Sequence, residues 1–200
     1  MSQPKPFLIR SRTQLEALSS SLRQELSDAL AETGAASVAE LASILGRAPD
    51  GLYYHLRILE KAGLATSVRR QLSGRKTELV YRSIARRMAI DLEAMRRSGN
   101  QTVCAIVGSM LRLGARDYRR AFGHHETVLA GPGRELMAKR TTVWLKPAQV
   151  RATINSIEQL DRDMSGSPKT GRLYAITVLF TPLKTSSRGR SKPTQRKAPK

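Results

Sequence analysis

The 200-residue sequence has one cysteine, few aromatic residues and no long apolar run. The single cysteine, Cys104, excludes an internal disulfide and is typical of a reducing compartment. Aromatic residues make up only 4% of the chain, too few to line a large aromatic pocket. No apolar run reaches the length of a membrane span, and residues 1–12 lack the apolar core of a signal peptide. We therefore expect a cytoplasmic protein with no membrane partner.

Acidic residues are also scarce, with 16 Asp and Glu against 35 Lys and Arg and a net charge of +19. Such a surplus predicts an anionic partner. Nucleic acid is favoured over a membrane, because no helical pattern here combines a basic face with bulky apolar residues and Trp. The hydrophobic fraction of 40% suffices for a helical core built on Leu, Ile, Val and Met.

Residues 37–63 have the pattern of two short helices joined by a tight turn. Ser37 and Glu40 form an S-x-x-E capping box, in which each side chain satisfies a free backbone N–H of the other. Gly46 supplies the positive φ that ends the first helix, and Pro49 suits the first turn of the second. The second helix carries one apolar stripe. This pattern predicts a helix-turn-helix.

A hairpin should follow the second helix. Residues 64–68 and 77–83 are rich in β-branched and apolar residues, and residues 69–76 between them hold a Ser-Gly pair and four cations. A hairpin with a basic tip is expected to lie on a polyanion, for which the phosphate backbone of nucleic acid fits best. We expect this hairpin to be the wing of a winged helix-turn-helix.

The series ELASILGRAPDGLYYHLRILEKAGL, with the preceding LEALSSSLRQELSDALAETG, resembles the winged-helix domain of ArsR-type (arsenical-resistance repressor) bacterial transcription regulators. The resemblance covers residues 12–83. It implies a repressor that binds double-stranded DNA as a homodimer. LRLGARDYRRAF and VWLKPAQVRATINSI resemble a C-terminal extension found in a branch of that family, which implies no defined activity.

The side chains off the apolar stripe at the start of the second helix are the candidates for reading DNA. Arg47 or Arg57 could bond guanine O6 and N7, and Gly51 would let the backbone approach the groove wall. The two tyrosines either reach phosphates or a thymine methyl, or pack on the base of the wing. His55 is expected to be a hydrogen-bonded structural histidine. With the wing cations, the predicted DNA-binding residues are Arg47, Asp50, Gly51, Tyr53, Tyr54, Arg57, Arg69, Arg70, Arg75 and Lys76.

Two further helices are expected beyond the wing. Met88, Leu92 and Met95 form one stripe, and a longer helix should run over residues 102–122. Small residues on the longer helix leave room for a second helix to approach closely, which favours dimerisation. Alternatively, the stripe packs on its own winged domain. The predicted dimerisation residues are Val103, Ile106, Val107, Met110, Leu111, Gly114 and Tyr118.

The remaining chain suggests a small strand-helix-strand unit and a tail. Residues 141–145 alternate as a strand, Pro147 opens a helix, and residues 173–180 form a second strand. Two strands make no stable sheet, so they must borrow an edge from the wing, the N-terminal arm or a partner subunit. The predicted parts are an arm (1–10), the winged helix-turn-helix (11–85), a helical dimerisation segment with linker (86–138), the strand-helix-strand unit (139–183) and a disordered basic tail (184–200). The fold class is mainly α, of the α+β kind.

Neither a metal site nor catalytic chemistry is expected. The cysteine site of the resembled family would lie at residues 40–43, which hold no cysteine. The family's alternative Asp/His sites on the dimerisation helix are not matched either, because residues 102–122 have no histidine and, of acidic residues, only Asp117. His124 and His125 are adjacent in a loop and should point apart. No nucleophile elbow, phosphate-binding loop or H-E-x-x-H motif occurs. We expect no cofactor and no enzyme.

These features predict a sequence-specific double-stranded DNA-binding regulator, a homodimeric repressor, with an effector of unknown kind, small molecule or protein, at the C-terminal unit. One alternative is a nucleoid- or RNA-associated protein that uses the same charge without sequence choice. Another is a protein-interaction module that has lost DNA reading. The wing cations argue against the last alternative, and the polar face of Tyr53, Tyr54 and Arg57 argues against the first.

Overall fold

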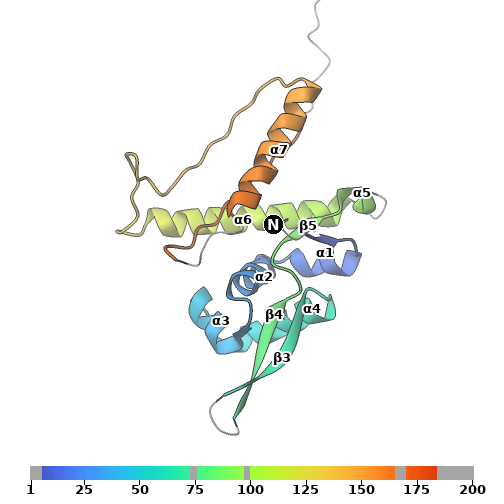
Figure 1. Cartoon of the computed structure of the whole chain (residues 1–200), viewed down its shortest axis with the longest axis vertical. Helices are drawn as coiled ribbons and strands as arrows, with labels where there is room; N and C mark the ends of the chain where they lie inside the picture. The colour runs from blue at the N-terminus through green and yellow to red at the C-terminus, as the bar shows by residue number, and fades with distance from the viewer. Residues whose placement is uncertain (1–5, 73–75, 97–99, 165–169, 184–200) are drawn as a thin grey trace, which may run out of the picture.

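The computed structural model describes residues 6–72, 76–96, 100–164 and 170–183 (Figure 1). It is a mixed α+β structure, with an N-terminal helical region, a wing-like antiparallel sheet and seven helices within the described residues. The predicted tail at 184–200 lies outside these residues, as does Arg75. Helices that are both apolar and long enough to cross a membrane are absent from the described parts of the chain.

Two helices form the back of the winged region. Helix α1 spans Arg12–Leu18 and helix α2 spans Ser21–Thr33. Ser11 and Gln14 form a capping box at the start of α1. A serine cluster separates the two helices, because Ser19 ends α1 and donates its hydroxyl to the Glu16 carbonyl at 2.7 Å, while Ser20 begins α2 as its N-cap.

The helix-turn-helix forms where it is predicted. Helix α3 spans Val38–Leu45 and helix α4 spans Asp50–Lys61. The backbone N–H of Ser37 donates to Glu40 Oε2 at 2.6 Å, and the N–H of Glu40 donates to Ser37 Oγ at 3.2 Å. Gly46 ends α3 in the left-handed region, with φ of 60° and ψ of 44°. These observations confirm the capping box and the glycine turn.

The wing is a three-stranded antiparallel sheet in the order β2-β4-β3. Its strands are β2 (Ala36–Ser37), β3 (Ala65–Gln71) and β4 (Thr77–Ser83). The predicted hairpin is confirmed, with Val68 opposite Val80. Strand β3 is longer than expected, so two of the four predicted tip cations lie within the strand.

A second, two-stranded parallel sheet joins the N-terminal arm to the chain after the wing. Strand β1 (Phe7–Ile9) pairs with β5 (Met88–Ile90), and the short helix α5 (Leu92–Met95) follows. The expectation that Met88 starts a helical stripe is therefore wrong. The arm supplies an edge for residues 88–90, and Asp91 then caps α5 by accepting from the N–H of Ala94 at 3.0 Å.

Helix α6 (Asn100–Phe122) packs across α1 and α2. The core of the winged region consists of leucines from α1 to α4, such as Leu15, Leu26 and Leu56, each with at most 1% of its surface exposed. Ile106 of α6 joins this cluster. The alternative prediction, that the stripe packs on its own domain, therefore holds for that part of the helix.

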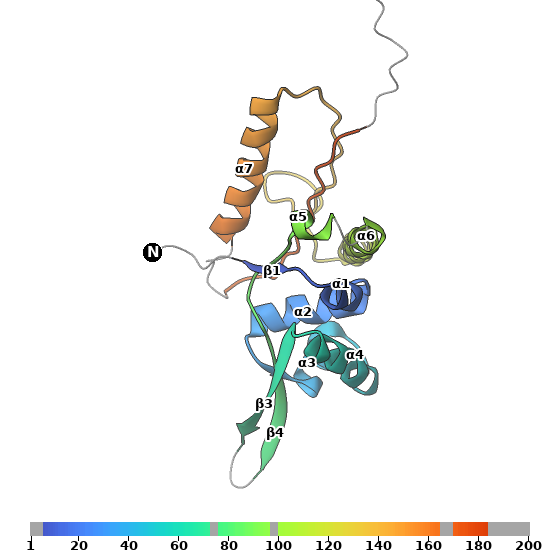
Figure 2. The ribbon, with the colours of Figure 1, turned by 90° about the vertical axis from the view of Figure 1, so that its right-hand side faces the viewer.

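Helix α7 (Pro147–Met164) begins at the predicted proline and stands apart from the winged core (Figures 1 and 2). The two strands predicted on either side of it do not form, since residues 141–145 and 173–180 are extended but unpaired. The strand prediction is wrong for this single chain because an alternating pattern becomes a strand only when it finds a hydrogen-bonding edge. The wing lies at the opposite end of the molecule and offers none (Figure 2).

Candidate nucleic-acid interface

Helix α4 has a buried face and an open face. Leu52, Leu56 and Leu59 are at most 1% exposed and anchor the helix in the core. Tyr53 and Tyr54, by contrast, are 46% and 67% exposed. The apolar stripe thereby fixes the direction in which the polar residues of α4 project.

Asp50, Gly51 and Arg57 share this open face. A Cβ atom built on Gly51 would meet no other atom within 4 Å, so packing does not require glycine there. Arg57 makes no hydrogen bond or ion pair with any residue that the structure describes. Its guanidinium is therefore available to a ligand.

His55 lies between the two faces of α4 and stands edge-on to the ring of Tyr54, with ring centroids 5.3 Å apart. Its Nδ1 atom is buried and has no hydrogen-bond partner among the described residues. The expected hydrogen bond of a structural histidine is therefore not observed there. Burial, together with the nearby charges of Arg23 and Arg47, lowers the pKa of His55.

Arg47, in the turn before α4, is engaged inside the protein. Its guanidinium donates to Glu25 Oε2 at 3.0 Å. Arg116 of α6 donates to both oxygens of the same carboxylate, at 2.9 Å and 2.5 Å. The structure therefore gives Arg47 a role in joining the turn to α2 and α6, beside the predicted role in base reading.

Glu25 is a residue that the sequence patterns do not single out. It is buried, and burial acts to raise the pKa of its carboxyl, but the hydrogen bonds from Arg116 and Arg47 outweigh this effect and the pKa is lowered. The pKa of Arg116 is raised by the same hydrogen bond. The two arginines that bind Glu25 lie 22 and 91 residues from it in sequence, so no local sequence pattern could predict these contacts.

The wing cations differ in availability. Arg70 donates to Glu40 at 2.8 Å and to Glu78 at 2.7 Å, and these hydrogen bonds raise its pKa. Arg69 and Lys76 are exposed and form no ion pair with a described residue. The charge of Arg70 is thus largely compensated within the protein, whereas Arg69 and Lys76 can meet phosphates. Tip residue Arg75 lies outside the described residues.

The predicted dimerisation residues divide between two faces of α6. Ile106 is only 7% exposed and packs in the winged core, with the partly buried Val103 against the same cluster. Leu111 and Tyr118 are exposed, and Val107, Met110 and Gly114 are half-buried. Dimerisation through α6 therefore stays a prediction for its outer residues.

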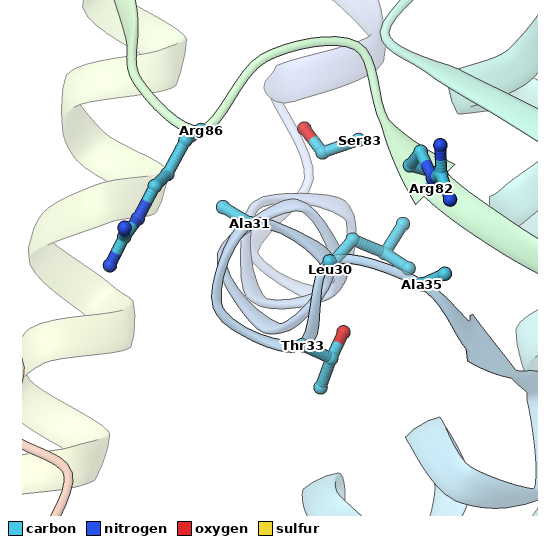
Figure 3. A pocket seen from close by; sticks show the side chains of 8 residues that line it. Leu30, Ala31, Thr33, Ala35, Arg82, Ser83 and Arg86 are labelled. Carbon is cyan, nitrogen blue, oxygen red and sulfur yellow. The ribbon is translucent and has the colours of Figure 1, made fainter. Parts of the chain in front are cut away.

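A shallow pocket of about 440 Å³ opens where α2 ends beside β4. Small side chains and backbone line most of it, and Figure 3 shows Arg82 and Arg86 on opposite sides of the α2 end. The two guanidinium groups do not converge on one point. In the part of the chain that the structure describes, no group of three His, Cys, Asp or Glu side chains is arranged to hold a metal ion.

An anchored α4 with an open polar face, next to an antiparallel wing with available cations, defines a winged helix-turn-helix of the DNA-binding class. Residues 18–68 match the family model described as a helix-turn-helix domain. This match covers less than half of the chain and shows a helix-turn-helix domain within these residues. The match covers α2, α3, α4 and the start of β3, and leaves α6 and α7 outside. No curated protein matches the chain.

Proposed function

We propose that the protein is a sequence-specific transcription regulator that binds double-stranded DNA as a homodimer and acts as a repressor. The observation that carries this proposal is the open face of α4, where Tyr53, Tyr54 and Arg57 project beside the wing and Arg57 has no ion-pair partner in the described chain. A side chain that is positioned but unpaired suits direct readout of base edges.

In this mechanism α4 of each subunit enters a major groove, and the two grooves lie about 34 Å apart on one side of the duplex. Arg57 reads a base edge, while Arg69 and Lys76 neutralise flanking phosphates. The two tyrosines contact phosphates or a thymine methyl. Asp50 and Gly51 lie at the start of α4, where a recognition helix comes closest to the bases.

The rest of the chain would serve assembly and control. The outer residues of α6, such as Leu111 and Tyr118, are available to a second subunit. We assign the arm to residues 1–10, the DNA-binding domain to 11–85, the dimerisation segment to 86–138 and a C-terminal unit to 139–183. An effector acting on the C-terminal unit would change the spacing of the two recognition helices. The protein would act in the cytoplasm, on the nucleoid.

Non-specific binding to nucleoid DNA or RNA is the second candidate function. The net charge of +19 supports it, because phosphate neutralisation alone supplies affinity without sequence choice. The two functions differ in whether base identity matters. They agree in predicting a steep dependence of affinity on salt concentration.

The deciding experiment measures binding of the full chain to the duplex upstream of its own gene and to a scrambled duplex, at several salt concentrations. A preference of about a thousandfold or more at physiological salt supports a regulator. Equal affinity, with equally steep salt dependence, would refute the regulator and leave the non-specific binder.

A further inference from the structure

The chain beyond α6 exposes more apolar surface than a free protein normally does. Helix α7 has no buried residue. Trp144 is 88% exposed and Leu173 is 75% exposed, and Tyr174, Ile176 and Phe180 are each about half exposed. Over residues 127–164 and 170–183, exposed apolar side chains offer on the order of 1,000 Å². Exposed apolar area on this scale favours an interaction site.

The backbone of this region is also unpaired. Residues 141–145 and 173–180 are extended, and no backbone hydrogen bond joins them to another described residue. Their N–H and C=O groups therefore form strand edges without partners. An edge of this kind is a template for pairing with another chain.

Specific contacts join this region to α6, to the segment before β5 and within itself. A Cβ atom on Gly114 would lie 3.2 Å from Thr177 Oγ1, so the extended segment approaches α6 closely there. Tyr174 donates a hydrogen bond to Glu135 Oε1 at 2.6 Å. An ion pair between Arg87 and Asp161 joins α7 to the segment before β5. The segment at residues 173–180 thus lies against α6, which has exposed apolar residues of its own.

The charge of α7 argues against nucleic acid as the occupant of the face that this helix presents. In a chain with net charge +19, α7 carries two arginines against three carboxylates. A helix of this composition does not attract phosphates. Its apolar area is instead of the order that one partner contributes to a stable protein interface, about 800 Å².

We propose that the occupant is a second copy of this chain, and that residues 141–145 and 173–180 pair as β-strands between the two copies, with α7 covering the joint sheet. Pairing across a two-fold axis satisfies the edges of both copies at once and continues onto the exposed face of α6. This inference rests on the proposed function in so far as that function requires a dimer, and it names the surface that holds the dimer together.

The test measures the dimer dissociation constant of the full chain by sedimentation equilibrium, over concentrations from about 1 to 100 µM. The variants are Ile176→Lys and Val178→Lys, both at exposed positions where the winged fold does not depend on them. The control is Val68→Lys on the wing, because Val68 is 43% exposed and Val178 is 45% exposed.

We expect a dimer for the wild type and for Val68→Lys, and a dissociation constant raised about tenfold or more in the two C-terminal variants, because a strand-face lysine would be buried in the joint sheet. A monomeric wild type over this range overturns the proposal. So does a dimer that both C-terminal variants leave equally tight.

Amide hydrogen exchange provides the second measurement. The amides of residues 173–180 should exchange slowly in the dimer and quickly after dilution to monomer. Slow exchange in the monomer would show that the chain covers its own segment, and it would overturn the proposal.

Binding to the upstream duplex separates this inference from the proposed function. A dimer that weakens in both C-terminal variants but shows no duplex preference refutes the regulator and supports the interface. A specific binder whose dimer resists both substitutions refutes the interface and supports the regulator.

Discussion

Arg47, in the turn of the helix-turn-helix, and Arg116, on α6, bind the same carboxylate, that of Glu25 on α2. The turn that leads into α4 is thereby tied to α6, the helix that leads toward the C-terminal residues. Any movement of α6 that withdraws Arg116 changes the charge that Arg47 experiences. For Arg47 to reach DNA, its bond to Glu25 must break.

Replacement of Glu25 by Gln should destabilise the protein by about 2 kcal/mol, because two guanidinium groups lose a charged acceptor in a partly buried site. The free energy of unfolding from urea denaturation measures this effect. The matched control is Glu16→Gln, which removes an exposed i,i+4 pair with Arg12 and should cost less than about 0.5 kcal/mol. Equal losses in the two variants would contradict a structural role for Glu25.

The raised pKa of Asp28 predicts that the stability of the protein depends on pH. Desolvation, with repulsion from Asp117, Glu25 and Glu32, raises the pKa of Asp28 to about 6. The folded state therefore binds more protons than the unfolded state between pH 3.8 and about 6, and this group lowers the unfolding free energy as pH rises through that window.

Asp28→Asn should therefore stabilise the protein at pH 7 and make little difference at pH 3.5. Solvent reaches Asp28, which screens the repulsion, so we expect a gain of about 1 kcal/mol rather than the full value of the shift. Urea denaturation of both proteins across this pH range measures the difference. Asp163→Asn, at the exposed end of α7, is the control; the assignment fails if the gain at pH 7 is absent or is matched by this control.

Local chemistry predicts the DNA-binding region well. The Ser37 and Glu40 capping box, the turn at Gly46 and the leucine stripe of α4 each depend on residues within one or two helical turns. Their positions follow from the chain alone. The open face of α4 follows in turn, because a helix with one buried stripe must expose the opposite side.

Relationships between distant residues are not predictable in this way. From the sequence alone, an acidic residue inside α2 is expected to face solvent. No residue near Glu25 in sequence indicates that two arginines from other elements bind it. Residues 173–180 are predicted as a strand from their composition, but a strand also needs a hydrogen-bonding edge, and the described part of the chain pairs none with them. The prediction of a helix at Met88 is wrong for the opposite reason. There the N-terminal arm supplies an edge for strand pairing, and the helical spacing of the apolar residues does not indicate it.

Arg57→Ala should reduce affinity for the specific duplex by about 1 to 3 kcal/mol and leave affinity for a scrambled duplex nearly unchanged, because a base contact is lost. Fluorescence anisotropy with both duplexes measures this. The control is Arg47→Ala, since Arg47 is held by Glu25 and its loss should lower stability more than it lowers specificity. A larger loss of specificity from Arg47→Ala would mean that the turn, and not α4, reads the bases.

The neighbouring wing residues Arg69 and Arg70 provide a matched test of phosphate binding. Arg69 is exposed without an ion pair in the described chain, whereas Arg70 is held by Glu40 and Glu78. Each phosphate contact releases counterions, so Arg69→Ala should reduce the slope of log affinity against log salt by about 1.

Arg70→Ala should leave that slope nearly unchanged, because two carboxylates already neutralise the guanidinium in the free protein. Titrations at four or more salt concentrations with the scrambled duplex measure both slopes without any contribution from base reading. Equal reductions in the two variants would show that DNA displaces Glu40 and Glu78 from Arg70.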